Sequence, residues 1–447
     1  MTIGMFSSFI TRHWFSTVAV DIWSDDATLQ AWLDVEAALA LAQAKLGLIP
    51  SDAADRIAAC CDAKGFDYAR LSKEIAFAQH PFVPVLKQLE EFCGEPAAGF
   101  IHWGATTQNI FDTAIALQLK KTHHHLIAVL DRTEQRLKGL ANDHRKTLQA
   151  GRTHGQHALP TTFGYKVAGW HEEIRRSRER LTERGAQSFL AYFGGAIGTF
   201  AAMGGKGRAV EEEVARRLGL QPARLPLRSS FDRVADYLSA LAVLAGSVHK
   251  IAQDIVFMQR SEIGEIEEAF HMGKVGSSTM AQKRNPSAAL VLISLCRLLE
   301  GRLPLILASM VRMDEGDSSA TNVSDIVVNE IAILATSIAE GVEHVLSGLQ
   351  VNTEAMRRNL DITQGLILSE SAMMQLSPRI GRHKAHHLLY DAAQKTTMEG
   401  IPFADTLSDA LKGVGLSDVT LDLAPEAYLG EINDIIQDLE ERPSGDN

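Results

Sequence analysis

The sequence predicts an all-α protein built around a bundle of long helices, and three observations support this fold class. Apolar residues recur at helical spacing along most of the 447 residues. Alternating apolar runs and Asn-Gly hairpin signals, which mark β-strands, are scarce. The helical patterns in the middle of the chain are long and apolar on nearly every face, so other helices must enclose them.

Composition narrows the classes of function. Apolar residues make up 46% of the chain and the net charge is −11, so the charge balance does not favour a nucleic-acid partner. No uncharged apolar run reaches the roughly 18 residues that a membrane span requires. A small anionic substrate is compatible with this balance, because a basic pocket can lie within an acidic protein.

The cysteines and the N-terminus bear on the compartment. The four cysteines fit no zinc-binding spacing, and adjacent Cys60 and Cys61 make a poor disulfide framework. The first residues show no charged segment followed by an apolar one, as a secretory signal would. We therefore expect a reduced, cytoplasmic protein.

The predicted helices follow in order along the chain. The first, from Ser24 to Leu48, begins at a Ser-Asp-Asp capping cluster and ends near Gly47 and Pro50. The next long pattern runs from 110 to about 148.

The second half of the chain contains the most apolar patterns. Between Val234 and Ile255, apolar residues alternate in steps of four and three, which is the seam of a packed bundle. Two further patterns, 286–313 and 325–349, are apolar nearly all round, and the first starts with proline at a favourable first-turn position. Such helices are expected to be buried between subunits.

Breaks in these patterns divide the chain into three predicted domains. Glycines from 193 to 207 form a flexible crossover, 313–322 is a polar stretch, and helical patterns shorten after Asn352. We predict an N-terminal helical domain at 1–105, a central long-helix bundle at 106–353 and a C-terminal helical domain at 354–447.

The segment from Gly273 to Pro286 carries a dense group of reactive side chains. Its glycines make it mobile, and it offers hydroxyls, a cation and an amide just before a helix N-terminus, where anions are favoured. These side chains belong to Ser277, Ser278, Lys283 and Asn285. By composition alone, the segment could equally be a polar connection between helices.

The loop resembles the signature Gly-Ser-Ser-x-Met-Pro-x-Lys-x-Asn-Pro of the fumarase/aspartase superfamily. Each fixed position matches except the proline, which is Ala281 here. The resemblance implies that Ser277 is the catalytic base. It also implies that Ser278, Lys283 and Asn285 bind the substrate, and that Lys283 and loop N–H groups stabilise the oxyanion of Ser277.

A second segment, from Gly151 to Pro160, resembles the Arg-Thr-His-x-x-Gln motif of the same superfamily. The glutamine falls one place early, at Gln156. The resemblance implies that His154 transfers a proton, a task suited to imidazole near neutral pH. His157 has the weaker claim and could serve only as a local hydrogen-bonding residue.

A third segment, 102–113, is a helix start by its hydroxyl and amide residues. It resembles the superfamily's Gly-x-Thr-Ser-x-Asp segment, whose hydroxyls hold a substrate carboxylate. Substrate-binding roles follow by resemblance for Thr106, Thr107 and Gln108. Asn109 stands in place of the aspartate and removes a charge.

Two single residues complete the candidate site. His80 precedes a proline and is either a turn residue or a substrate-site residue, because its segment resembles one in the adenylosuccinate lyase and carboxymuconate cycloisomerase branches. Asp232 and Arg233 resemble the last two residues of the Arg-Asp-Arg motif of those branches. In this chain Phe231 stands in place of the first arginine. Arg233 could equally form an ion pair on a helix surface.

Two suggestive patterns are set aside. The run from His123 to His125 does not suit a metal, because consecutive residues on a helix point about 100° apart. The glycines at 194–207 do not form a phosphate-binding loop. The chemistry of the superfamily requires no metal and no organic cofactor, so we expect neither.

The resemblance covers nearly the whole chain and is strongest to the adenylosuccinate lyase and 3-carboxy-cis,cis-muconate cycloisomerase branch. It implies a three-domain fumarase/aspartase-like fold. In that fold the central bundle packs with those of other subunits, which implies a homotetramer with sites shared between subunits.

The implied function is a fumarate-releasing lyase that cleaves the C–N bond of an N-substituted aspartate or a related succinyl compound by β-elimination. Two alternatives stay open: a cycloisomerase reaction on a carboxymuconate, and a non-catalytic crystallin-like structural role. The leaving-group half of the substrate, the choice of His80 or His154 as acid, and the role of 313–325 also stay open.

Overall fold

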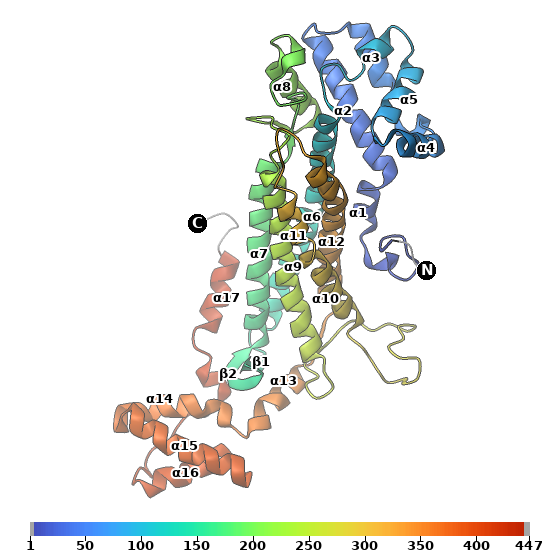
Figure 1. Ribbon diagram of the computed structural model, residues 1–447. Coiled ribbons are helices and arrows are strands. Elements are labelled where there is room, and N and C mark those ends of the chain that lie inside the picture. Colours follow the sequence, from blue (N-terminus) through green and yellow to red (C-terminus); the bar gives the residue numbers. More distant parts are fainter. Residues whose placement is uncertain (1–3, 442–447) are drawn as a thin grey trace. The chain divides into compact units, whose positions relative to one another are not determined.

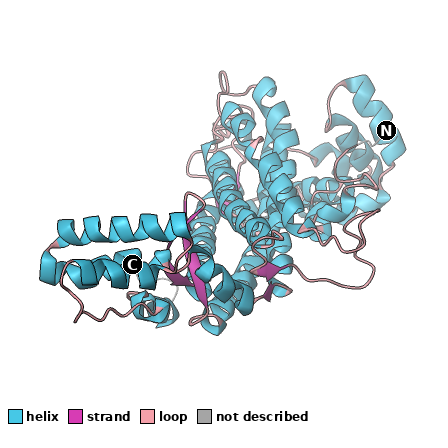
Figure 2. Cartoon of the chain, turned by 90° about the horizontal axis from the view of Figure 1, so that it is seen from below, coloured by secondary structure: helices cyan, strands magenta, loops and turns pink. Residues whose placement is uncertain are grey.

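The chain is chiefly helical in the computed structural model, which describes residues 4–441 (Figure 1). Helices dominate Figure 2, and the strands of the described residues form three two-stranded sheets. The all-α class predicted from the sequence is therefore confirmed.

Helices of very different lengths follow one another along the chain, with short strands between some of them. The first part of the chain holds α1 (Thr17–Ile22), α2 (Asp25–Lys45), α3 (Ser51–Cys60), α4 (Tyr68–Ala78), α5 (Val83–Cys93), α6 (Thr107–Asp143), β1 (Leu148–Thr153), β2 (Gln156–Thr162), α7 (Phe163–Ser188), β3 (Leu190–Ala191), α8 (Gly207–Leu218) and β4 (Gln221–Pro222). The rest holds α9 (Asp232–Met258), β5 (Ile266–Glu267), α10 (Ser287–Glu300), α11 (Leu303–Ala308), α12 (Ser318–Ser347), β6 (Gln350–Val351), α13 (Thr353–Leu360), α14 (Ser369–Ile380), α15 (Arg382–Glu399), α16 (Phe403–Gly413) and α17 (Ile432–Glu441).

The chain divides into two compact units. The first unit comprises residues 1–130, 177–248 and 294–340, and the second comprises residues 131–176, 249–293 and 341–447. The long helices α6, α7, α9, α10 and α12 contribute residues to both units. The domain boundaries near residues 105 and 353 stay predictions.

In the first unit, α2 packs against α6 near the start of that helix. α2 packs against α3 and α8, and Ser24 caps α2 by accepting a hydrogen bond of 3.2 Å from the backbone N–H of Ala27. Trp32 of α2 stacks on Phe111 of α6 with ring centroids 4.3 Å apart. The predicted capping cluster at the start of the first long helix is thereby confirmed.

Polar side chains tie the long helices of the first unit together. His123 of α6 lies 3.1 Å from the hydroxyl of Tyr237 on α9. His125 of α6 lies 2.7 Å from the carboxylate of Glu340 on α12. The neighbouring histidines of α6 therefore face different helices.

The apolar seam of α9 is buried along its length. Each of these residues is at most 8% exposed: Val234, Leu238, Leu241, Ala245, Val248, Ala252 and Ile255. The seam predicted for a packed bundle is thus confirmed. By length and composition α9 would also suit a membrane span, and it is the one such helix among the described residues, but core helices of soluble proteins pass the same test.

In the second unit, three C-terminal helices form a small core of their own. α14, α15 and α16 pack side by side (Figure 1). Their buried contacts come from Leu376, Leu389, Phe403, Leu407 and Leu411. The shorter helices predicted after Asn352 are present here.

The helix predicted at 286–313 is two helices in the structure. α10 ends at Glu300, and α11 begins at Leu303. Pro304 lies in the first turn of α11, where a missing N–H is harmless, whereas in a continuous helix it would clash with the preceding turn. Arg302, between the two helices, pairs with Glu330 of α12 at 3.0 Å.

The next helix begins earlier than predicted. α12 starts at Ser318 rather than at 325. Asp317 accepts hydrogen bonds from the backbone N–H of Ser319 at 2.9 Å and from its hydroxyl at 2.6 Å. The second half of the polar stretch is therefore the capped first turn of a helix.

The structure also contains a β-hairpin that the sequence pattern did not predict. β1 and β2 pair antiparallel, with Thr153 opposite Gln156. Between them, His154 (φ 53°) and Gly155 (φ 78°) both lie in the left-handed region, as a type I′ turn requires. The turn lacks an Asn-Gly pair and β2 contains Pro160, so the usual hairpin signals were missing.

Candidate active site

The segment that joins β5 to α10, residues 268–286, is the candidate catalytic loop, and a hydrogen bond within the loop holds residues 276 and 285 together. Asn285 Nδ2 donates a hydrogen bond of 2.5 Å to the carbonyl of Gly276. A Cβ at Gly276 would come within 2.1 Å of the Lys283 carbonyl oxygen, so glycine is required there. Asn285, predicted to bind substrate, closes the loop in this structure.

Ser277 accepts two hydrogen bonds from its own loop. The backbone N–H groups of Thr279 and Met280 lie 3.2 and 3.0 Å from Ser277 Oγ. Two N–H dipoles aimed at one oxygen favour negative charge on it. Ser278 follows on the exposed side of the loop.

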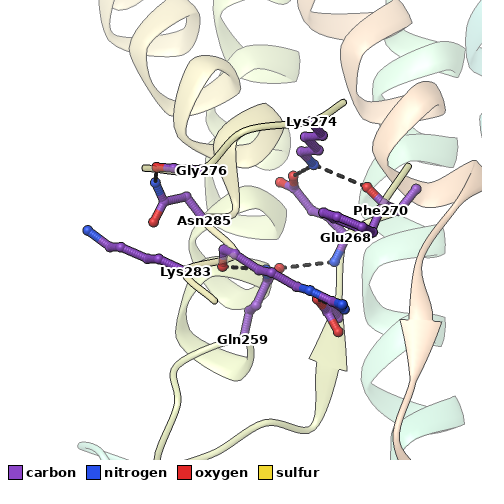
Figure 3. A pocket seen from close by; sticks show the side chains of 10 residues that line it. Gln259, Glu268, Phe270, Lys274, Gly276, Lys283 and Asn285 are labelled. Atoms are coloured by element: carbon purple, nitrogen blue, oxygen red, sulfur yellow. Dashed lines mark hydrogen bonds and ion pairs between the residues drawn. The ribbon is translucent and has the colours of Figure 1, made fainter. Parts of the chain in front are cut away.

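Glu268 occupies the N-terminus of α10, where the sequence suggested that a bound anion would be favoured. Its carboxylate accepts hydrogen bonds from the backbone N–H groups of Ala288 at 3.2 Å and Ala289 at 2.6 Å. Lys274 Nζ lies 3.2 Å from the same carboxylate (Figure 3). A carboxylate of the protein itself therefore already meets this helix dipole.

The pocket at the root of the loop is small in this conformation. Its lining includes Gln259, Glu268, Lys274, Gly276, Lys283 and Asn285 (Figure 3). The cavity volume is about 10 Å³, close to the space that one water molecule needs. The Lys283 ammonium points away from Glu268 and Lys274 (Figure 3). A substrate would not fit between these residues unless the loop moved.

His154, the predicted acid, lies at the exposed tip of the β1–β2 hairpin in the same unit as the loop. A bulge shifts the strand register between Ala150 and Arg152. At the bulge, a Cβ on Gly151 would come within 2.8 Å of the Leu159 carbonyl oxygen. The bulge and the left-handed turn together determine where the hairpin presents His154.

A buried ion pair lies at the base of this hairpin, and sequence reasoning missed it. Arg152 Nη2 lies 2.5 Å from Glu265, whose side chain is fully buried. Burial alone would raise the pKa of Glu265, but hydrogen bonds from Arg152, Asn359 and Gln149 outweigh it and lower the pKa. The carboxylate therefore stays ionised inside the protein.

His157 faces the same ion pair from the opposite strand. Its Cα is paired in register with that of Arg152. Among the described residues, its buried Nδ1 has no hydrogen-bond partner. Burial and the neighbouring Arg152 lower the pKa of His157, which favours the neutral ring.

In the first unit, Thr106, Thr107 and Gln108 lie at the start of α6, as the capping pattern predicted. The Thr106 N–H donates a 3.1 Å hydrogen bond to Asn109 Oδ1, and the Gly195 N–H donates to the same oxygen at 3.1 Å. Asn109 is 1% exposed. The amide that replaces the motif's aspartate thus ties α6 to the glycine-rich crossover.

Next to this turn lies a charged cluster that sequence reasoning also missed. Gln108 Nε2 donates a hydrogen bond of 2.6 Å to Asp112. Burial raises the pKa of Asp112 to about 6, although Arg312 partly opposes the shift. The Arg312 guanidinium lies 4.4 Å from the ring centre of Phe231. Arg312 therefore lies beside Phe231, the position at which this chain lacks the first arginine of the Arg-Asp-Arg motif.

His80 and Arg233 lie on other elements of the first unit. His80 Nδ1 accepts hydrogen bonds from the backbone N–H groups of Phe82 at 3.3 Å and Val83 at 3.2 Å, so it caps α5. Arg233 is exposed on α9, and its Nη1 lies 3.4 Å from the carbonyl of Gln187. His80 thus has the turn role that its place before a proline suggested. Its substrate role stays a prediction.

The structure therefore groups the candidate residues unevenly. Four of them share the catalytic loop: Ser277, Ser278, Lys283 and Asn285. His154 belongs to the same compact unit, whereas His80, Thr106, Thr107, Gln108 and Arg233 belong to the first unit. Their assembly into one site stays a prediction.

The chain resembles known enzymes over nearly its whole length. Residues 16–301 match a family model described as a lyase. The N-acetyl-S-(2-succino)cysteine lyase of Dickeya dadantii is 37% identical over 412 residues, covering 92% of this chain and 90% of that protein. The adenylosuccinate lyase of Pyrococcus abyssi is 36% identical over 423 residues, covering 94% of each chain.

Solved structures show the same fold. A fumarate lyase from Mesorhizobium sp. BNC1 is 33% identical, with a TM-score of 0.87 over 96% of this chain and 99% of that one. The 3-carboxy-cis,cis-muconate lactonizing enzyme of Pseudomonas putida is 34% identical, with a TM-score of 0.87 over 96% of this chain and 97% of that one. The chain belongs to the lyase family of the fumarase/aspartase superfamily, in the branch that contains adenylosuccinate lyases and 3-carboxy-cis,cis-muconate cycloisomerases.

Proposed function

We propose that this enzyme releases fumarate from a succinyl-substituted compound by β-elimination, with Ser277 as the base. The observation that carries the proposal is the pair of backbone N–H groups, from Thr279 and Met280, that donate to Ser277 Oγ. A serine hydroxyl ionises only when its oxyanion is stabilised, and converging N–H dipoles supply that stabilisation.

The proposed reaction builds charge on the substrate. Ser277 removes a proton from the carbon beside a carboxylate, and the electron pair passes into that carboxylate before it expels the group on the neighbouring carbon. The transient dianion requires fixed donors and positive charge. In this proposal Lys283 supplies the charge, and Asn285 and Ser278 supply hydrogen bonds from the opened loop. Thr106, Thr107 and Gln108 hold the other carboxylate.

His154 is the proposed acid, with His80 as the alternative. An amine cannot leave as its anion, so cleavage of a C–N bond requires a proton at the nitrogen. A thiolate is a stable leaving group, because a cysteine thiol ionises near pH 8.5. The demand for an acid therefore depends on the atom that leaves.

We favour sulfur as the leaving atom over the nitrogen expected from the sequence. Two relatives, 37% and 38% identical, are each named N-acetyl-S-(2-succino)cysteine lyase. Cleavage of an N-substituted aspartate is retained, because adenylosuccinate lyases are 36% and 34% identical. A cycloisomerase reaction is a second candidate, because the cycloisomerase of Pseudomonas putida is 36% identical.

A substrate panel tests the proposal. The purified enzyme is given N-acetyl-S-(2-succino)cysteine, adenylosuccinate or 3-carboxy-cis,cis-muconate. Ultraviolet absorbance follows fumarate for the first two compounds and the loss of the conjugated diene for the third, with Ser277→Ala as the blank. We expect fumarate and N-acetylcysteine from the first compound. Turnover of the muconate alone would replace the lyase proposal with the cycloisomerase one. Turnover of none by the folded enzyme would overturn both.

We also propose a homotetramer whose sites are shared between subunits. The single chain leaves large apolar side chains exposed on the first unit: Leu305 (44%), Leu307 (50%), Val311 (77%) and Ile326 (62%). Exposed apolar side chains gathered on neighbouring segments commonly mark an interface. Light scattering should give four chains per particle, and a monomer would contradict the proposal.

A further inference from the structure

The carboxylate of Glu265 is the centre of a buried hydrogen-bond network in the second unit. It accepts from Arg152 at 3.0 and 2.5 Å, from Gln149 at 2.8 Å and from Asn359 at 2.9 Å. Two oxygens thus receive four donors, which fills the acceptor capacity of a carboxylate. A buried carboxylate whose acceptor positions are all filled is held in one arrangement.

The backbone of Glu265 is anchored as well. Its N–H donates to the carbonyl of Met258 at 2.9 Å, and its carbonyl accepts from the N–H of Asn352 at 2.9 Å. The residue therefore joins the end of α9 to the segment between β6 and α13. No part of Glu265 is exposed.

The segments that carry His154 and Ser277 both start from residues of this network. Arg152 is part of β1, and the turn that presents His154 follows directly after Thr153. Glu265 itself runs into β5 and then into the catalytic loop that carries Ser277. One side chain thus connects the base of the hairpin to the root of the loop.

We propose that Glu265 is a positioning residue that, through its ion pair with Arg152, sets the placement of the His154 hairpin against the root of the Ser277 loop. The inference rests on the proposed function, because it assigns the acid and base roles to these two residues. Glu265 is fully buried, and side chains of the protein fill the acceptor positions of its carboxylate, so it does not touch the substrate. It acts through Arg152, whose planar guanidinium binds both carboxylate oxygens.

The kinetic test uses Glu265→Gln and Arg152→Lys in the full chain. Glutamine keeps the shape but loses the charge, and lysine keeps the charge but loses the two-pronged contact. Each should lower kcat about 100-fold with little change in KM, the cost of a misplacement of roughly 1 Å. The double variant should lose no more than either single variant, because both act through one ion pair.

Asp254→Asn is the matched control. Asp254 is a carboxylate in the same unit that accepts a 3.0 Å hydrogen bond from Trp170 and lies 3.6 Å from Lys166. Its loss should leave kcat near that of the wild type. Near-normal kcat in folded Glu265→Gln, or an equal loss in Asp254→Asn, would overturn the inference. If Glu265→Gln does not fold, Arg152→Lys decides in the same way.

A second readout does not depend on turnover. Amide hydrogen exchange should quicken in Glu265→Gln at residues 148–162 and 268–286, and not in Asp254→Asn. Unchanged exchange in both segments would overturn the inference even in an active enzyme. If the wild type acts on none of the panel compounds, faster exchange in both segments still supports the anchor, so the two proposals fail separately.

Discussion

The hairpin that presents His154 and the loop that carries Ser277 belong to the same compact unit but are held in opposite ways. The hairpin rests on a buried ion pair between Arg152 and Glu265, whereas the loop exposes its apolar side chains, with Met272 at 91% and Val275 at 77% exposure. Around Ser277 the loop is held by bonds within itself. In the proposed mechanism, His154 as the acid would then lie on a fixed support and Ser277 as the base on a movable one, so that the site could close around its substrate without displacing the acid.

The largest expected effect comes from the loop. Ser277→Ala should lower kcat about 10³-fold or more, because it removes the proposed proton acceptor. The fold should persist, because the Ser277 side chain is only partly buried on a surface loop. The measurement is fumarate release together with a melting curve. Ser287→Ala, at the first residue of α10 directly after the loop, serves as the control. Near-normal turnover in Ser277→Ala would show that Ser277 is not the base.

The hairpin should give a loss that depends on the leaving atom. His154→Gln should reduce cleavage of a C–N substrate about 100-fold, the loss typical of a missing general acid. Cleavage of the thioether should fall less, because a thiolate leaves without a proton. The ratio of the two rates in variant and wild type is the quantity to measure. Equal losses on both substrates would indicate that His154 acts only as a binding residue.

Substitutions at two glycines test the loop and the hairpin separately. Gly276→Ala should lower kcat about 10- to 100-fold, because its Cβ would meet the Lys283 carbonyl at 2.1 Å and distort the loop. Gly155→Asn should cost less than Gly276→Ala, because nothing lies within 4 Å of that Cβ and asparagine adopts a left-handed φ more readily than most side chains. Turnover and melting temperature measure both. Unchanged turnover and melting temperature in Gly276→Ala would mean that the close approach of Gly276 and Lys283 does not constrain the loop.

Lowering the pH should weaken the ion pair between Glu265 and Arg152 that supports the hairpin. The pKa of Glu265 is lower in the folded chain than its ordinary value of 4.5. Its stabilising contribution is therefore complete above about pH 4.5 and is lost as pH falls through the folded pKa. The difference in melting temperature between wild type and Glu265→Gln should shrink below that pH. A difference that stays constant from about pH 7 to well below pH 4.5 would contradict this linkage.

The smallest expected effect concerns the flexibility of the loop. Ala281→Pro should stiffen the exposed segment and stabilise the chain by less than about 1 kcal/mol. Limited proteolysis should cut the variant more slowly at residues 268–286. Wild type and variant cut at the same rate would show that Ala281 does not contribute to loop mobility.

Regular features were predictable from the sequence because they repeat. The seam from Val234 to Ile255, the cap at Ser24 and the helix start at Thr107 each follow a local pattern that burial or hydrogen bonding then confirms. Pro304 also carried a signal, since proline in a long apolar run marks a helix start. Its place within a strongly apolar pattern concealed the break between α10 and α11.

The missed residues share a different property. Glu265 and Arg152 meet across 113 positions of sequence, and Asp112 interacts with Arg312 across a still longer span of chain. No local spacing encodes such contacts, because their partners are set by how the helices pack. The hairpin was missed for a related reason: its turn uses His154 and Gly155, and its bulge depends on a close approach at Gly151.

The network around Glu265 also has a consequence for how the chain reaches its native state. Its side-chain donors lie 116, 113 and 94 residues away in sequence, at Gln149, Arg152 and Asn359. Contacts of such long range form late, because a long segment must be ordered before they contribute. During synthesis, the Glu265 carboxylate lacks one of its donors until Asn359 has emerged from the ribosome. We therefore expect the hairpin that carries His154 to settle only after the C-terminal part has been synthesised, so that catalytic competence is among the last properties the enzyme acquires.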